Sequence, residues 1–148
     1  MADRSYIAEN DRERRRLEAL VGKLDDAALG RAMPAGWTVA SVLAHLAFWD
    51  QRIVLFCEQL GRGAPIPAID SPDVDWINDA AKPMQLALPP RRAATLAVET
   101  ARAADQAVAT LSDELLAKNA AAGHPLNVAR AEHRRVHLDE IEQALARG

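Results

Sequence analysis

Residues 36–60 read GWTVASVLAHLAFWDQRIVLFCEQL, and they carry the clearest helix signal in the chain. Thr38 is a favoured N-cap residue, and Trp37 before it can pack against Val42 as a hydrophobic staple. Gly61 and Gly63 then end the helix. Between these signals, large apolar side chains recur every three or four residues, which predicts one buried face. That face is made of Val42, Leu46, Trp49, Ile53, Phe56 and Leu60.

Three further stretches predict long helices with an apolar face, at residues 5–24, 90–111 and 126–146. The connection that leads into the helix at 90–111 is rich in proline and glycine, and a short helix is expected within it at 71–81. Extended at about 3.3 Å per residue, this connection can cross a whole bundle and start the third long helix parallel to the second. The sequence therefore predicts an all-α fold, a four-helix bundle with a long crossover between its second and third helices.

Length and composition limit the class of protein. The 148 residues suit a single domain, residues 1–148, and aromatic residues at 4% argue against a β-sandwich or barrel. A net charge of -3 leaves no broad basic surface, so we expect no nucleic-acid partner. The charged N-terminus lacks a signal peptide, and the longest uncharged stretch, 32–49, contains proline, glycine and polar residues, so we expect no membrane span. A single cysteine excludes an intrachain disulfide and favours a reducing compartment, hence a cytoplasmic location.

Three of the four histidines lie where the interior of a bundle is expected. His133 and His137 are four residues apart and so share one helix face, which otherwise carries apolar residues. His45 borders the apolar stripe of its own helix. It lies level with His137 if the two helices are antiparallel and with His133 if they are parallel, so the three rings can converge in either arrangement.

A divalent metal ion would satisfy one nitrogen of each buried imidazole, which is costly to bury without a partner. Three histidine ligands leave a coordination position open for water or substrate, as in catalytic metal sites. Glu140 follows His137 by one helical turn, and its carboxylate could hold the second nitrogen of a ligand ring.

The same residues also have plainer interpretations. The histidines can be hydrogen-bonded core residues without a metal, and Trp49 can belong to the core instead of the wall of a substrate cavity. The run from His133 to His137 lacks the glutamate of the HExxH motif, so a protease of that class is not expected. His124 is expected in a loop, and Cys57 is expected to be a small core residue.

Residues 36–50, with GWTV followed by VLAHL and WD, resemble the signature of the DinB/YfiT-like metal-binding bundles. Residues 131–141, AEHRRVHLDEI, are similar to the HxxxH helix of that superfamily, and residues 74–78, VDWIN, to a segment that often follows its second helix. The superfamily includes the N-terminal domain of mycothiol-dependent maleylpyruvate isomerase. The resemblance implies a four-helix bundle in the up-down-down-up order.

The resemblance also implies a divalent ion, commonly zinc or nickel, held by His45, His133 and His137. Members with known activities are S-transferases and isomerases that use low-molecular-weight thiols such as mycothiol, bacillithiol or glutathione. We therefore expect a metal-dependent enzyme acting on a small electrophilic substrate, with metal-assisted hydrolysis as a close variant. The alternative is a non-catalytic, stress-linked bundle that binds a metal or ligand. The resemblance favours a homodimer in either case.

Overall fold

The computed structural model describes residues 2–66 and 72–147. All the regular secondary-structure elements in this part of the chain are helices. Over the same residues, the one β pairing is an isolated bridge between Ala32 and Thr38. The all-α prediction is therefore confirmed. The helices are α1 (Tyr6–Lys23), α2 (Asp26–Leu29), η1 (Pro34–Gly36), α3 (Val39–Gly61), α4 (Pro72–Ala87), α5 (Pro90–Ala109), α6 (Asp113–Ala121) and α7 (Ala131–Ala146).

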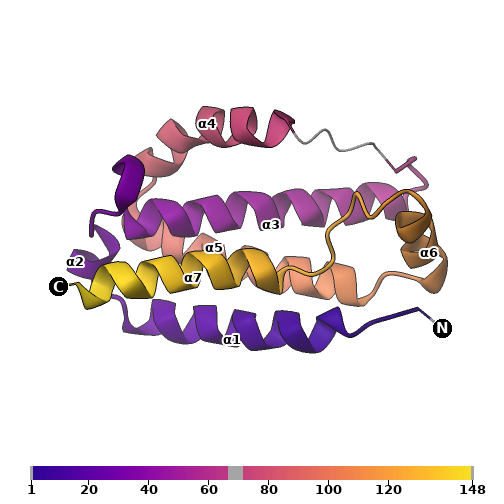
Figure 1. The fold of residues 1–148 in the computed structure, drawn as a ribbon, viewed down its shortest axis with the longest axis horizontal. Coiled ribbons are helices and arrows are strands. Elements are labelled where there is room, and N and C mark those ends of the chain that lie inside the picture. Colours follow the sequence, from indigo (N-terminus) through magenta and orange to yellow (C-terminus); the bar gives the residue numbers. More distant parts are fainter. Residues whose placement is uncertain (1, 67–71, 148) are drawn as a thin grey trace.

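The four longest described helices that share the core, α1, α3, α5 and α7, extend along the long axis of the molecule (Figure 1). Helix α4 lies along α3 and returns the chain to the end where α3 begins, so α3 and α5 run in the same direction (Figure 1). Helices α1 and α7 run in the opposite direction (Figure 1). The long connection predicted between the second and third helices thus contains a helix of its own.

Helix α4 is longer than the helix expected at 71–81, because it continues past Pro83 to Ala87. A proline inside a helix removes one backbone hydrogen bond and usually ends or bends the helix. Here α4 packs along α3, and Gln85 beyond the proline is buried. Tertiary packing therefore supports the helix on both sides of Pro83.

Small side chains bring α5 close to its neighbours. Alanines repeat along its inner face and are fully buried, which allows α3 and α5 to form the most extensive contact between helices in the described structure. The large apolar side chains of α3 pack against this alanine-rich face of α5. The buried alanines are Ala93, Ala94, Ala97, Ala101 and Ala104.

A layer of buried charges separates two apolar clusters halfway along the molecule. Leu46 of α3 belongs to one cluster and Ile53 to the other, and Asp50 between them is buried. Arg134 of α7 is 0% exposed and donates hydrogen bonds to Asp105 of α5 at 2.7 and 2.9 Å, and to Asp50 at 3.3 Å. Arg130 is also buried, and it is paired with Asp50.

The predicted start of the final helix at residue 126 is wrong, because α7 begins at Ala131. Asn10 of α1 accepts a hydrogen bond from the backbone N–H of Ala131 at 2.9 Å and donates one to the carbonyl of Val128 at 2.9 Å. Asn119 similarly bonds both backbone groups of Leu126. Side chains from distant elements thus hold residues 126–130 in a non-helical course.

Among the described helices, α3 alone is long and apolar enough to cross a membrane by composition. Its most apolar window is 67% buried within the protein. The core helix of a water-soluble protein meets the same criterion, so this helix is weak evidence for a membrane span.

Candidate metal centre

The first turn of α3 fixes the position of His45. Thr38 is the N-cap, as predicted: its side chain accepts a hydrogen bond from the backbone N–H of Ser41 at 3.1 Å, and the Ser41 hydroxyl accepts one from the N–H of Thr38 at 2.8 Å. This reciprocal capping box satisfies two amide donors that would otherwise have no partner. Trp37 packs with its ring centroid 5.8 Å from that of His45. The residues that start the helix therefore also orient the imidazole.

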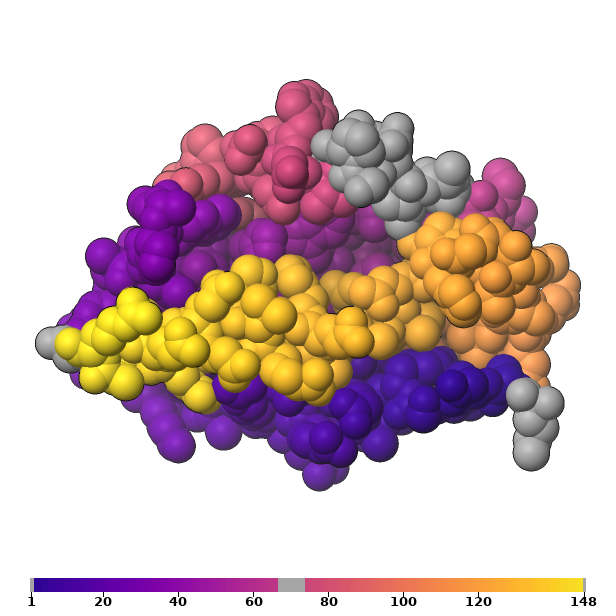
Figure 2. Space-filling view, viewed as in Figure 1, coloured from indigo at the N-terminus to yellow at the C-terminus, as the bar shows by residue number. Residues whose placement is uncertain are grey.

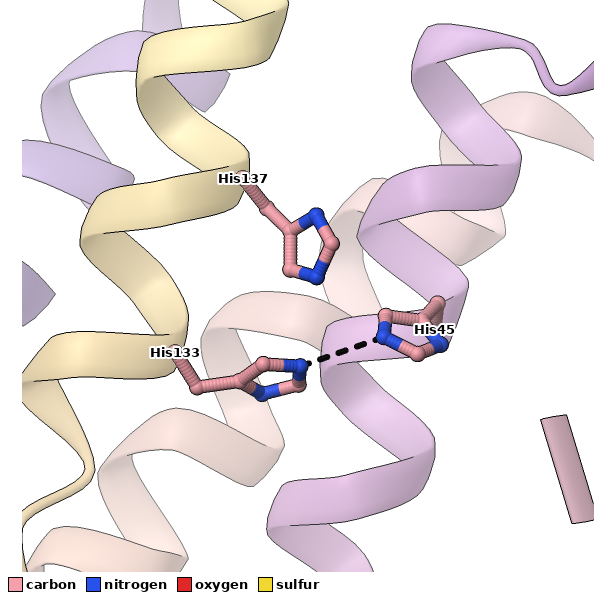
Figure 3. A group of neighbouring side chains, drawn as sticks. All are labelled: His45, His133 and His137. Atoms are coloured by element: carbon pink, nitrogen blue, oxygen red, sulfur yellow. Dashed lines mark hydrogen bonds between the residues drawn. The ribbon is translucent and has the colours of Figure 1, made fainter. Parts of the chain in front are cut away.

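The structure brings together the three histidines that the sequence singled out. His45 lies on α3, and His133 and His137 lie on α7, with their rings turned toward one another (Figure 3). The Nε2 atoms of His45 and His133 are 3.1 Å apart, and one potential ligand atom from each of the three rings lies within 4.8 Å of the others. Two nitrogens on one tetrahedral zinc ion are about 3.3 Å apart, given bond lengths of about 2.0–2.1 Å. The spacing of His45 and His133 matches this value, and the His137 ring lies nearby at a spacing of up to 4.8 Å.

Burial keeps two of the rings neutral. His45 is 8% exposed, and loss of solvent contact, followed by repulsion from His137, lowers its pKa to about 4. The pKa of His133 falls to about 3, again mainly through burial, with smaller effects from the neighbouring histidines and from Arg130 and Arg134. Neutral imidazoles carry the lone pair that a metal ion requires. His45 and His133 can therefore each offer a lone pair to a cation at neutral pH.

Glu140 lies where the sequence places it, one turn beyond His137. Its Oε2 atom is 3.1 Å from Nδ1 of His137. A carboxylate at this distance accepts the Nδ1–H hydrogen bond, which leaves the lone pair on Nε2. By contrast, Nδ1 of His45 is buried without a hydrogen-bond partner in the described structure, so packing against Trp37 orients that ring.

A cavity of about 580 Å³ opens beside the histidines. It lies among α3, α4, α7 and the segment that leads into α7, and the recess between α4 and α7 is visible in Figure 2. Trp49 lines it instead of being closed into the core, and its indole N–H donates to Oδ1 of Asn78 on α4 at 2.7 Å. The walls are mostly apolar, and all three histidines and Glu140 reach them.

Two other residues lie where expected and take no part in this site. His124 is exposed in the loop after α6, with a positive φ of 60°. Cys57 is buried on α3, and burial raises the pKa of its thiol to about 11. A thiol with so high a pKa is a poor nucleophile or metal ligand.

The sequence interpretation missed the arginines of the cavity. Arg130 lines it and donates through Nε to Asp50 at 2.9 Å, while Arg52 lines it from α3. Arg52 is two helical turns beyond His45, a spacing that places both on one face of α3. That spacing was the available signal for Arg52. Asp50 is held by Arg130 and Arg134.

Comparison with protein families gives one match: the sequence model of the DinB superfamily covers residues 9–140. This span includes the three histidines and Glu140. Comparison with curated proteins and with solved structures gave no significant match. Because the family match extends over most of the chain, the protein belongs to the DinB superfamily.

Proposed function

We propose that the protein binds one divalent cation, zinc or nickel, through His45, His133 and His137. The observation that carries this proposal is the convergence of three imidazoles from two helices within 4.8 Å. In the described structure the Nε2 atoms of His45 and His133 bond each other, and a cation would instead bind a lone pair from each ring. Glu140 supports the proposal by fixing the orientation of the His137 ring.

We further propose that the site is catalytic, and that the protein is a metal-dependent S-transferase or isomerase using a low-molecular-weight thiol on a small electrophile. Three protein ligands leave a coordination position free, and the cavity beside the histidines has room for a small molecule. A divalent ion at such a position lowers the pKa of a coordinating thiol or water. The known activities of the superfamily favour the thiol.

The protein's own side chains have separate tasks in this proposal. The histidines hold the cation, and Glu140 keeps one ring in the required tautomer. Trp49, fixed by Asn78, and Trp37 form walls that limit the access of water to the reacting groups. Asp50 is engaged by two arginines, so it is not assigned the transfer of a proton.

The proposal includes the architecture of the superfamily. We assign α1, α3, α5 and α7 to an up-down-down-up four-helix bundle that forms a single domain over residues 1–148. The helix directions in Figure 1 and the helix contacts support this assignment.

Zinc titration of protein purified without a histidine tag tests the metal site. We expect one tightly bound ion per chain, and we expect His133→Ala to lose it because one of three ligands is removed. His124→Ala is the matched control, since His124 is exposed and does not line the cavity. Zinc binding that survives His133→Ala unchanged would contradict the proposed site.

A second assay separates an enzyme from a non-catalytic binding protein. The zinc-loaded protein is mixed with a thiol, such as glutathione or a mycothiol analogue, and a generic aryl halide electrophile. Thiol conjugation that disappears in His133→Ala supports the transferase. Stoichiometric metal binding with no acceleration for any thiol favours the non-catalytic alternative.

A further inference from the structure

Two guanidinium groups line the cavity on the side opposite Glu140. Arg52 follows His45 by seven residues on α3, which is about 10 Å along the helix axis. Arg130 precedes His133 by three residues at the start of α7. Helices α3 and α7 run in opposite directions (Figure 1). Arg52 follows His45 and Arg130 precedes His133, so both arginines lie toward the same end of the cavity that they line. Glu140 follows His137 toward the other end, so the cavity has a cationic end and a histidine end.

The cationic end has more positive charge than its described neighbours neutralise. Arg130 is paired with Asp50, and Arg134, which also bonds Asp50, has Asp105 as its main partner, so both of these guanidinium groups are neutralised. Arg52 has no carboxylate partner among the described residues. Glu140 is the one acidic side chain among the residues that line the cavity, and it is paired with His137. Among the described residues, Arg52 is therefore the cation of this cavity that no carboxylate neutralises.

Aromatic side chains hold Arg52 in place. The guanidinium carbon lies 5.4 Å from the ring centroid of Trp49 and 6.0 Å from that of Phe56. Trp49 is in turn hydrogen-bonded to Asn78 of α4. Arg52 and Arg130 line the same cavity. Burial, followed by repulsion from Arg130, lowers the pKa of Arg52. An anion placed between them would relieve this repulsion.

The rest of the cavity suits an organic molecule better than a bare ion. Val42, Ile53, Val74 and Pro125 give it mainly apolar walls. A planar guanidinium binds a carboxylate or phosphate through two parallel hydrogen bonds, while apolar walls bind the hydrocarbon part of the same molecule.

We propose that the cavity binds a small organic anion, whose carboxylate or phosphate group lies between Arg52 and Arg130 and whose apolar body lies against Ile53, Val74 and Pro125. This inference rests on the proposed function in one respect, that the bound molecule is the substrate and directs its reactive end to the histidines. The anion selectivity itself needs no metal. The substrate class of the enzyme is then anionic electrophiles or thiols that carry a carboxylate or phosphate.

Calorimetric titration with three probes of similar shape tests the charge requirement. The tag-free protein, after removal of metal by a chelator, is titrated with benzoate, with phenyl phosphate and with neutral benzamide. We expect one of the two anions to bind at least about tenfold more tightly than benzamide, the effect of a charged hydrogen-bonding pair. The tighter of the two anions identifies carboxylate or phosphate as the preferred group. Equal or absent binding of all three probes would overturn the proposal.

Substitutions of Arg52 test the location. Arg52→Gln keeps a polar but shorter side chain and removes its charge, so we expect it to weaken anion binding about tenfold and to leave benzamide unaffected. Arg52→Lys should recover part of the affinity, because it keeps the charge but loses the planar fork. Arg62→Gln is the control, since Arg62 is exposed at the C-cap of the same helix. Unchanged anion preference in Arg52→Gln would overturn the assignment of the site.

Zinc affinity measured on the same variants keeps the two proposals apart. We expect Arg52→Gln to bind zinc as the unsubstituted protein does, because Arg52 is not a ligand. Failure of the unsubstituted protein to bind zinc would remove the proposed function, while anion preference in the metal-free protein would still support the anion site. Zinc binding without anion preference would overturn the anion site and leave the proposed metal site supported.

Discussion

The orientation of His137 depends on one hydrogen bond. Glu140 lies 3.1 Å from its Nδ1 atom and comes from the same turn of α7, so the helix itself sets the distance between the two groups. His45 has no such partner in the described structure and relies on packing against Trp37. The three ligands are therefore held by different means, and His137 is the one whose basicity a carboxylate increases.

Replacing Glu140 with alanine should weaken zinc binding by about tenfold or more, the usual effect of losing the carboxylate behind a ligand histidine. Competition with a chromophoric chelator measures the change. Glu132→Ala, also on an exposed position of α7, should leave zinc affinity close to that of the unsubstituted protein. An affinity that Glu140→Ala does not reduce would show that the hydrogen bond to His137 has no part in metal binding.

The three candidate histidine ligands could be predicted from the sequence, but the burial of Arg130 and Arg134 could not. The spacing of an HxxxH pair is enough to predict that both histidines lie on one face of a helix, because residues four apart are neighbours on its surface. Arg130 and Arg134 carry no such local signal. They are buried only because Asp50 of α3 and Asp105 of α5 accept their hydrogen bonds, and those partners are distant in sequence.

At the level of the helices, some boundaries are set by local capping residues and others by contacts with residues distant in sequence. The start of α3 could be predicted because its N-cap residue, Thr38, lies three residues from the amide that it caps. The start of α7 could not, because Asn10 on α1 supplies the side chain that accepts from its first amide. The extension of α4 past Pro83 likewise depends on its packing against α3.

Thr38→Ala should lower the free energy of unfolding by about 1 kcal/mol, the usual cost of losing an N-cap side chain. Urea denaturation followed by circular dichroism measures this difference. Thr95→Ala is the comparison, because the Thr95 hydroxyl bonds only the carbonyl of Arg91 in its own helix. A bond of that kind adds little stability to a helix. Equal effects of the two substitutions would mean that the capping box does not stabilise α3.

At the scale of the whole molecule, the buried ion pairs connect the helices at mid-height. Asp105 of α5 accepts from Arg134 of α7 and from Arg14 of α1 at 2.8 Å, and Asp50 links the same group to α3. Two apolar clusters pack on either side. The network sets the register of the four helices, and it lies next to the histidines through Arg134 and Arg130.

Asp105→Ala should destabilise the protein by about 3 kcal/mol or more, because Arg134 is left buried without its main partner. The loss is measured by urea denaturation. The double variant Asp105→Leu with Arg134→Met should recover much of the stability, since an apolar pair needs no charge compensation. Glu114→Ala, which removes an exposed partner of Lys118, should change stability by less than about 0.5 kcal/mol. An Asp105→Ala variant as stable as the unsubstituted protein would contradict the role of the network.

The most direct test of the metal centre is X-ray absorption at the zinc edge, measured on tag-free protein loaded with one equivalent of zinc and dialysed. We expect retained zinc with three imidazole nitrogens at about 2.0–2.1 Å and one further light ligand. A spectrum without the multiple scattering of imidazole rings, or a protein that loses its zinc on dialysis, would contradict it.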